Sequence, residues 1–185
     1  SKAQQARKPH GDWPARPLLL QLALHLPYDH AHMLKFFANR AIEGVEHVDE
    51  KSRLWRTIRL GIGRKVHKGW ICADFFVKTK NTLPITISAS LVPVLEQLVP
   101  MLRAAFDLDA QPSAIDAVLL RDFPNTEGQR VAGCFDGFEL TVRAILGQQI
   151  TVQAARTLAL RLVTKFGEPL KNTINKDIPV HHLFP

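Results

Sequence analysis

The chain has 185 residues, of which 46% are hydrophobic, and a formal net charge of +7 from 24 basic and 17 acidic residues. This length allows one large domain or two small ones, and the apolar content is sufficient for a substantial core. Residues 1–16 are polar and basic, which excludes a secretory signal there, and the longest apolar run is about half the length of a membrane span. We therefore expect a soluble, cytoplasmic protein without a membrane partner.

Cofactor and metal sites find little support in the residue pattern. Cys72 and Cys134 stand in no Cys-x-x-Cys pattern, and two buried thiols are favoured over a disulfide. His30 and His32 could hold a metal on a strand, but they are expected to begin a helix, on which residues two apart face different ways. We expect neither a cofactor nor a metal.

The first part of the chain is expected to pass from a tail into alternating strands and helices. Residues 1–16 show no apolar periodicity and are typical of a linker or tail. Residues 18–26 form a strand candidate between two prolines, and Asp29 is placed as the N-cap of a helix that reaches about Ala41. Between residues 45 and 88, apolar side chains recur with a period of two, which predicts an antiparallel sheet.

A second helix completes this unit. Ser90 can cap it, and apolar residues follow helical spacing as far as Phe106. Residues 107–112 are rich in turn formers and mark a candidate boundary. We therefore expect an α+β N-terminal domain over residues 17–111, after the tail at residues 1–16.

Basic residues are concentrated between residues 51 and 80. This segment carries nine lysines and arginines and a single acidic residue, Asp74. Such a cluster is the electrostatic footprint of a polyanion such as nucleic acid, and Arg56, Arg59 and Lys68 are the candidate phosphate contacts. The alternative is a solvated strand face on which lysines discourage edge pairing.

Residues 112–185 are expected to form a second, helical domain. Ser113 can cap a short helix, and Asp136 with Glu139 makes a capping-box-like start to a longer one. Residues 168–185 lack periodicity and are expected to be loop. The pattern therefore predicts an all-helical second part that follows the α+β domain.

A short polar turn joins the two longer helices of this part. Gly147–Ile150 ends the first helix, and Thr151 caps the second, which extends to Gly167. The amides of Gln148 and Gln149 can donate and accept hydrogen bonds at base edges, and the N-terminal amides of the second helix can face phosphate. The alternative is an ordinary helix corner whose glutamines face water.

Two regions of the sequence resemble one known family. Val142–Val152 (VRAILGQQITV) is similar to the beginning of the catalytic domain of the bacterial 3-methyladenine DNA glycosylase II family, which belongs to the helix-hairpin-helix DNA glycosylases. Pro27–Asp29 and the segment Met33–Ala41 are similar to the N-terminal domain of that family. Both regions occur in the family's order and with compatible spacing.

This resemblance implies a fold and an activity. The fold would be an antiparallel, TATA-binding-protein-like sheet with helices, followed by the first helices of a helix-hairpin-helix glycosylase domain. The activity would be hydrolysis of the N-glycosidic bond of alkylated bases such as 3-methyladenine in double-stranded DNA. The lesion nucleotide would be rotated out of the duplex before the bond is broken.

The resemblance also implies roles for individual residues. Gln149 matches the residue that fills the gap in the base stack, a position where close relatives often have leucine, and Gln148 matches its neighbour in the turn. Thr151 follows them as the cap of the next helix. Phe36 matches an aromatic residue of the base pocket, although a place in the hydrophobic core fits Phe36 as well.

The family's glycine-rich hairpin and catalytic aspartate are expected beyond Pro185. No aspartate of this chain matches the catalytic one, and Asp136 is explained as a helix cap. We therefore expect an incomplete glycosylase domain over residues 112–185 that has no turnover by itself. The complete protein is expected to be monomeric, and the fragment is expected to be open to self-association. The basic residues 1–16 fit a linker from the regulatory module of an alkylation-response fusion and fit an ordinary tail equally well.

Two other hypotheses belong to different functional classes. The chain could be a non-catalytic DNA-binding or regulatory module that uses the basic segment and the turn. It could also be a protein-interaction scaffold whose charge is incidental. Salt-dependent binding to DNA would distinguish the first of these from the second.

Overall fold

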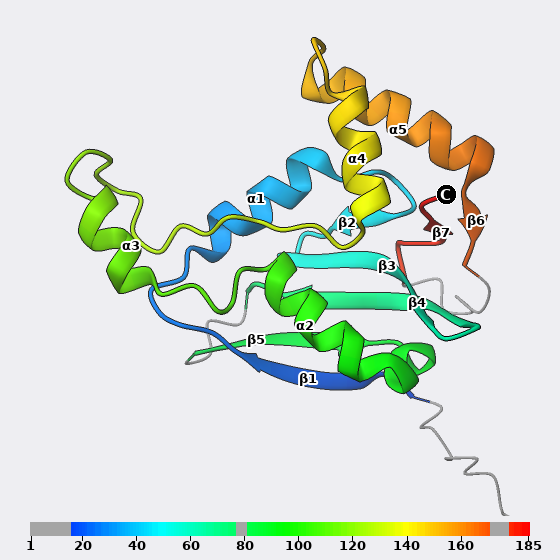
Figure 1. The fold of residues 1–185 in the computed structure, drawn as a ribbon, viewed down its shortest axis with the longest axis horizontal. Helices are drawn as coiled ribbons and strands as arrows, with labels where there is room; N and C mark the ends of the chain where they lie inside the picture. The colour runs from blue at the N-terminus through cyan, green and yellow to red at the C-terminus, as the bar shows by residue number, and fades with distance from the viewer. Residues whose placement is uncertain (1–15, 77–80, 171–177) are drawn as a thin grey trace, which may run out of the picture.

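The computed structural model describes residues 16–76, 81–170 and 178–185 (Figure 1). Apart from Arg16, the expected tail at residues 1–16 lies outside the described residues. The described part has an antiparallel sheet at its centre, with helices packed on it and a pair of helices that projects from one side (Figure 1). The predicted α+β class with an antiparallel sheet is confirmed.

The central sheet has five strands in the order β1-β5-β4-β3-β2, and all neighbouring strands are antiparallel. Its first strand ends earlier than expected, at Ala23. The strands are β1 (Leu18–Ala23), β2 (Glu46–Val48), β3 (Arg53–Ile62), β4 (Lys65–Asp74) and β5 (Thr82–Ile87).

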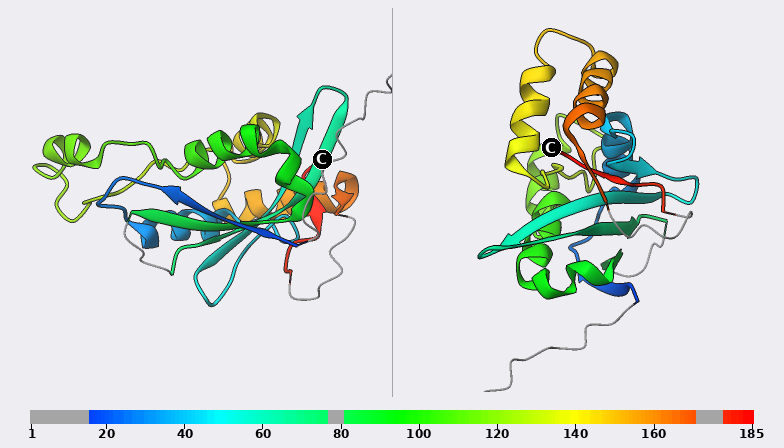
Figure 2. Two further views of the ribbon diagram at one scale, coloured as in Figure 1. Left: turned by 90° about the horizontal axis from the view of Figure 1, so that it is seen from below. Right: turned by 90° about the vertical axis from the view of Figure 1, so that its right-hand side faces the viewer.

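One face of the sheet carries the main hydrophobic core. Every second residue of a strand points to the same face, so Leu54 and Ile58 of β3 face the core together with Ile71 of β4. The helices that cover this face are α1 (His30–Arg40) and α2 (Leu95–Ala105), and Figure 2 shows them beside the sheet from two directions. The predicted cap of α1 is confirmed, because the Asp29 carboxylate accepts a hydrogen bond from the His32 amide at 2.9 Å.

The start of α2 differs from the expectation. A 3₁₀ segment, η1 (Ala89–Val94), precedes it, and Ser90 does not cap an α-helix. The hydroxyl of Ser88 accepts a hydrogen bond from the amide of Trp70 at 3.0 Å and lies 3.0 Å from the hydroxyl of Ser90. These serines therefore bond to the sheet and to each other, and a tertiary contact takes the place of the expected local cap.

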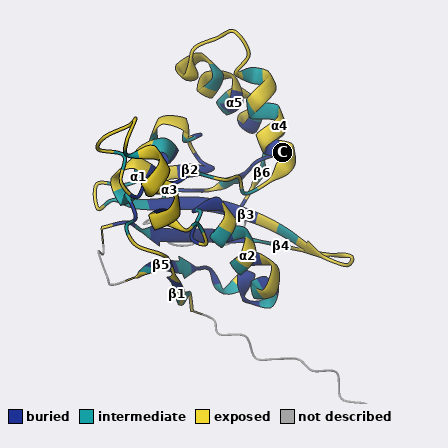
Figure 3. Ribbon diagram, turned by 60° about the vertical axis from the view of Figure 1, so that its left-hand side comes forward, coloured by how far each residue is buried: buried dark blue, intermediate teal, exposed yellow. Residues whose placement is uncertain are grey.

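Three helices follow, namely α3 (Pro112–Leu119), α4 (Gly137–Leu146) and α5 (Val152–Phe166). Ser113 does not cap α3, which begins with Pro112 in its first turn, where the missing N–H of proline costs nothing. The expected cap of α4 is confirmed, because Asp136 accepts from the amide of Glu139 at 2.7 Å. Figure 3 shows that α3, α4 and α5 carry much exposed surface, whereas the middle of the sheet is buried.

The last described residues were expected to be loop, and they instead return to the second face of the sheet. Two short antiparallel strands, β6 (Glu168–Pro169) and β7 (His182–Leu183), form a small sheet of their own. Thr57 on β3 donates a hydrogen bond to the carbonyl of His182 at 2.8 Å. A second apolar cluster joins the sheet to this segment through Trp55, Trp70, Cys72, Leu170, Val180 and Leu183.

These contacts bear on the expected division of the chain. The sequence predicts an N-terminal domain over residues 17–111 and a helical one over residues 112–185, yet residues 178–185 pack on the sheet. The boundary at residue 111 stays a prediction. Among the described residues, no helix combines the length and the hydrophobicity that crossing a membrane requires.

Candidate functional site

The turn between α4 and α5 is exposed throughout. Gly147 closes α4 by donating to the carbonyl of Arg143 at 2.9 Å, and the amide of Gln148 follows with a bond of 3.2 Å to the carbonyl of Ile145. The side-chain amide of Gln148 folds back on α4 and donates to the carbonyl of Ala144 at 3.1 Å. Gln148 therefore lies along its own helix, although it is exposed.

Gln149 stands at the tip of this turn in an uncommon backbone conformation. Its φ is 58°, in the left-handed region that residues with a Cβ rarely adopt and that costs about 1–2 kcal/mol. The residue is exposed, and its side chain has no hydrogen bond within the described part of the chain. Backbone strain of this kind occurs at functional sites more often than elsewhere, because the surrounding structure must be built to hold it.

Thr151 fixes the other side of the turn. Its hydroxyl accepts a hydrogen bond from the amide of Ala154 at 3.2 Å, which confirms the predicted cap of α5. The structure thus places the three sequence-predicted residues Gln148, Gln149 and Thr151 on one exposed corner between two capped helices. The hydroxyl of Thr151 is engaged in the cap, so its contribution to the corner is structural.

A buried ionic cluster fastens α4 to the sheet. Arg56 of β3 forms ion pairs with Glu46 of β2 and Glu139 of α4, and Arg143, one turn further along α4, bonds to the same two carboxylates at 2.7 Å each. The third nitrogen of the Arg143 guanidinium donates to the carbonyl of Arg40 at 2.7 Å. The two glutamates and Arg56 are about 4–5% exposed, so solvent does little to screen these pairs.

The cluster changes the acidity of Glu139. Burial by itself would raise the pKa of this carboxyl, but the charges and hydrogen bonds of Arg56 and Arg143 outweigh it and hold the pKa below its ordinary value. Glu139 is therefore ionised at neutral pH. It does not complete the expected capping box, because its carboxylate is bound to the two arginines.

Arg56 does not fit its predicted role as a phosphate contact. Its side chain is 4% exposed and is bound by two carboxylates, so a phosphate has no open approach to it. The sequence suggested a surface position because Arg56 lies within a run of basic residues. Its partner Glu46 is 10 residues away and Glu139 is 83 residues away, and nothing in the local pattern indicates these contacts.

Phe36 lies on the wall of a cavity between α1 and α4. The cavity has a volume of about 250 Å³ and is lined by aromatic rings and by the ionic cluster. Phe36 is half-buried, its ring stands at 88° to that of Phe37, and the guanidinium of Arg40 lies 4.1 Å from its centre. The remaining lining residues that matter here are Arg56, Phe135, Glu139 and Arg143.

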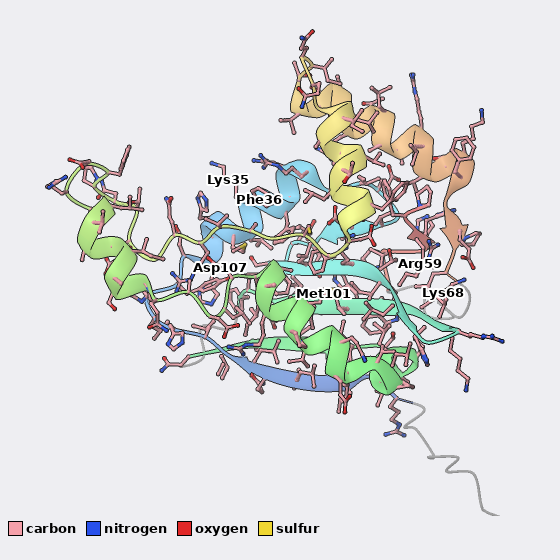
Figure 4. All side chains as sticks on the ribbon, in the orientation of Figure 1. Lys35, Phe36, Arg59, Lys68, Met101 and Asp107 are labelled. Atoms are coloured by element: carbon pink, nitrogen blue, oxygen red, sulfur yellow. The ribbon has the colours of Figure 1, made fainter. Side chains whose placement is uncertain are left out.

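Arg59 and Lys68 lie elsewhere. They face each other across β3 and β4, on the sheet face that carries the C-terminal strands, well apart from Phe36 (Figure 4). Glu168 of β6 forms ion pairs with both, at 3.4 Å to Arg59 and at 2.6 Å to Lys68. The structure therefore does not bring these two basic residues together with the turn.

The rest of the basic segment is divided in a similar way. Arg53 is bound to Asp49 at 2.7 Å, whereas Arg64 and Lys65 are exposed at the tip of the β3–β4 hairpin. Lys78 and Lys80 lie outside the described residues. The charge run thus includes structural ion pairs as well as solvated side chains.

Sequence reasoning missed the ionic cluster as a feature. Only one signal for it was present, the spacing of Glu139 and Arg143 by four residues on one helix, which allows an ion pair. In the described ranges, no group of three or more His, Cys, Asp or Glu side chains could hold a metal ion.

Comparisons with known proteins agree on one family. The sequence model of the AlkA N-terminal domain matches residues 19–136. DNA-3-methyladenine glycosylase 2 of Escherichia coli is 35% identical over 159 residues, which are 86% of this chain and 52% of that protein. The "probable bifunctional transcriptional activator/DNA repair enzyme AlkA" of Mycobacterium tuberculosis is 37% identical over 89 residues, 45% of this chain and 17% of its own length.

A solved structure supports the fold. MBOgg1, solved in complex with a low affinity DNA ligand, aligns with 93% of this chain and 52% of its own chain, at a TM-score of 0.56 and 15% sequence identity. At this identity the likeness concerns the fold alone. The chain spans about half the length of the E. coli relative, with 52% of that protein covered.

Proposed function

Because the chain belongs to the AlkA N-terminal domain family, we propose that it serves in base-excision repair as the DNA-binding N-terminal portion of a glycosylase. The proposed reaction of the complete protein is hydrolysis of the N-glycosidic bond of alkylated bases such as 3-methyladenine. The name of the E. coli relative, DNA-3-methyladenine glycosylase 2, supports this choice of substrate.

The exposed turn between α4 and α5 carries the proposal. An enzyme that acts on a base inside a duplex must rotate the nucleotide out of the stack and must offset the lost stacking. Gln149 lies at the tip of the corner, between the C-cap of α4 at Gly147 and the N-cap of α5 at Thr151. Its side chain is exposed to solvent. In this proposal Gln149 enters the gap left by the rotated nucleotide, and its amide bonds the orphaned base.

Two neighbouring features support this role. The ionic cluster holds α4 against β2 and β3, so the corner is attached to the sheet and does not move freely. The cavity beside Phe36 lies along the same helix and offers aromatic rings on which a base could stack. Phe36 is therefore proposed to contribute to the base pocket of the complete protein.

We further propose that the 185-residue chain does not turn over substrate by itself. Three of its described aspartates have structural roles: Asp136 caps α4, and Asp116 and Asp107 accept hydrogen bonds from the amides of Gly128 and Val131. A glycosidic cleavage needs a carboxylate that faces the sugar. Each of these three carboxylates is engaged by a backbone amide of the fold.

The first test is DNA binding by the chain. Fluorescence anisotropy would compare a duplex that contains a stable abasic-site analogue with an intact duplex of the same sequence. We expect the chain to bind the duplex with the abasic-site analogue (the abasic duplex) more tightly. The double variant Gln148→Ala, Gln149→Ala should lose that preference. Gln97→Ala, at an exposed glutamine of α2, is the matched control and should keep it. Equal binding of both duplexes by the unchanged chain would contradict the proposal.

The second test is base release. The polypeptide encoded by the complete reading frame should release 3-methyladenine from alkylated DNA, as detected by chromatography of the free base. The 185-residue chain should release none under the same conditions. Release by the chain alone would show that the catalytic carboxylate lies within it.

The non-catalytic module remains as the second hypothesis, and the structure weakens one of its supports. It relied on a basic sheet face, but Glu168 neutralises part of the charge of Arg59 and Lys68. Ion pairs at this degree of exposure are weak, so a phosphate could still compete for these side chains. Under this second hypothesis the Arg59→Ala, Lys68→Ala double variant should bind DNA more weakly than the unchanged chain, whereas nearly unchanged binding would show that this sheet face does not contact DNA.

A further inference from the structure

A groove lined by arginines lies directly behind the exposed turn. Its volume is about 160 Å³, and three helices each contribute one arginine to it: Arg40 of α1, Arg143 of α4 and Arg156 of α5. Gly147 and Ile150 also line it, and these residues flank Gln148 and Gln149 on either side. The groove and the turn are therefore two sides of the same corner. Small or aliphatic residues complete the lining: Val152, Ala155 and Ala159.

The arginines are held in place before any ligand binds. The Nε of Arg156 donates to the carbonyl of Ala41 at 3.0 Å, and Arg143 is fixed by the ionic cluster and by the carbonyl of Arg40. The guanidinium of Arg40 stacks over the ring of Phe36 at 4.1 Å. Since these side chains are already ordered, a ligand would lose little of its binding free energy to fixing them.

The groove has an excess of positive charge. Glu46 and Glu139 balance Arg56 and Arg143, which leaves the charges of Arg40 and Arg156 without a carboxylate among the residues that line the groove. Glu43 lines the adjoining cavity that shares Arg156, but the described part of the chain shows no ion pair between them. A ligand of this groove should therefore be an anion.

We propose that the groove binds a phosphodiester group of the DNA backbone, next to the point where the turn enters the duplex. This inference rests on the proposed function and adds a contact surface to it. The planar guanidinium matches the oxygens of a phosphate with two parallel hydrogen bonds. Contacts to phosphates position a protein on the duplex without reading its sequence. Arg40 and Arg156 would thus set the depth and angle at which Gln149 meets the stack.

The salt dependence of binding tests this directly. The affinity of the 185-residue chain for a fluorescein-labelled duplex is measured at several salt concentrations, for the unchanged chain and for Arg40→Ala and Arg156→Ala. Each lost phosphate contact should lower the slope of log affinity against log salt by about 0.9. Binding should weaken to a similar extent on duplexes of different sequence. Arg161→Ala removes the same charge from an exposed position of α5 outside the groove and should keep the slope.

Three results would overturn the inference. Slopes that stay unchanged in both groove variants would show that no phosphate is bound there. The preference for the abasic duplex would still stand as the separate test of the proposed function. An equal drop in Arg161→Ala would mean that the whole charged surface acts without a specific groove. Absence of binding by the unchanged chain would contradict both the groove and the DNA-binding role. Arg156 also donates to the carbonyl of Ala41, so thermal unfolding of each variant checks that it is still folded. Arg40→Ala tests the groove independently of that hydrogen bond.

Discussion

At the scale of single residues, Gln149 combines backbone strain with an exposed side chain. We expect Gln149→Gly to leave the free energy of unfolding unchanged or to raise it by up to about 1 kcal/mol, because glycine adopts a positive φ without a Cβ penalty while it also frees the unfolded chain. The Gln149→Gly variant should lose the preference for the abasic duplex. Urea unfolding and anisotropy measure the two effects.

Gln149→Ala is the matched control for this change. It keeps the strained backbone and removes the side-chain amide, so it should also lose the preference for the abasic duplex without any gain in stability. If Gln149→Gly kept the full preference, the side chain would have no part in filling the gap, and the proposed role of Gln149 would be wrong.

Glu139 gives a prediction for pH dependence. Its pKa is lowered in the folded state, from an ordinary value of 4.5, so its ionised form stabilises the fold. This contribution is complete at pH values above 4.5 and is lost as the pH falls further toward the folded-state pKa. We expect Glu139→Gln to cost about 3 kcal/mol near pH 7, because it removes one of the two carboxylates that balance the buried arginine charge. The difference from the unchanged chain should shrink in acid.

Denaturant unfolding at a series of pH values measures this difference. Glu96→Gln, at an exposed glutamate in the first turn of α2, should show the same pH dependence as the unchanged chain. If the free energies of unfolding of the unchanged chain and of Glu139→Gln differed by the same amount from neutral to acid pH, the assignment of the stabilising charge to Glu139 would be contradicted.

The residues that the sequence predicted correctly are those whose role depends on near neighbours. Asp29, Asp136 and Thr151 each bond an amide three residues ahead, so the local pattern contains all the information. Arg56 was assigned to the wrong environment because its partners come from β2 and α4. The groove formed by Arg40 and Arg156 could not be predicted either, since it requires the relative placement of α1 and α5.

At the scale of elements, the cap of α5 connects local structure with the site. We expect Thr151→Ala to cost about 1 kcal/mol of unfolding free energy, since it leaves an N-terminal amide of α5 without its acceptor. Thr151→Ser retains a hydroxyl and should lose little. Chemical denaturation of the three proteins checks this order. A loss in Thr151→Ser equal to that in Thr151→Ala would show that the methyl group, and not the cap, is responsible.

The long helices and the antiparallel sheet were predictable because each shows its own period over many residues. The short elements were not. The 3₁₀ segment at residues 89–94 arises where Ser88 bonds the sheet, and β7 has two residues, too few for any periodic signal. The residues around β7 are ordered by burial against Trp55 and Trp70, a contact between distant parts of the chain.

At the scale of the whole molecule, the described helices expose several large apolar side chains. Phe138 and Ile145 of α4 are 60% and 66% exposed, and Phe166 of α5 is 63% exposed. Exposed apolar patches of this kind promote association. We expect sedimentation velocity to show a growing fraction of dimers or larger species as the concentration of the 185-residue chain rises.

Serine substitutions identify the surface responsible. The double variant Ile145→Ser, Phe166→Ser should shift the chain toward monomer. Leu19→Ser, which removes a similarly exposed apolar side chain from β1 at 57% exposure, should not. A chain that stays monomeric at every concentration would show that these helix faces do not drive association.

The central claim is that the corner between α4 and α5 separates stacked bases. The most direct measurement places 2-aminopurine inside a fully paired duplex, where the fluorescence of this base rises when it loses a stacking partner. Saturating amounts of the chain should raise the fluorescence. The double variant Gln148→Ala, Gln149→Ala should leave it low even when anisotropy shows that the DNA is fully bound. An unchanged signal with the original chain, or an equal rise with the variant, would contradict the claim.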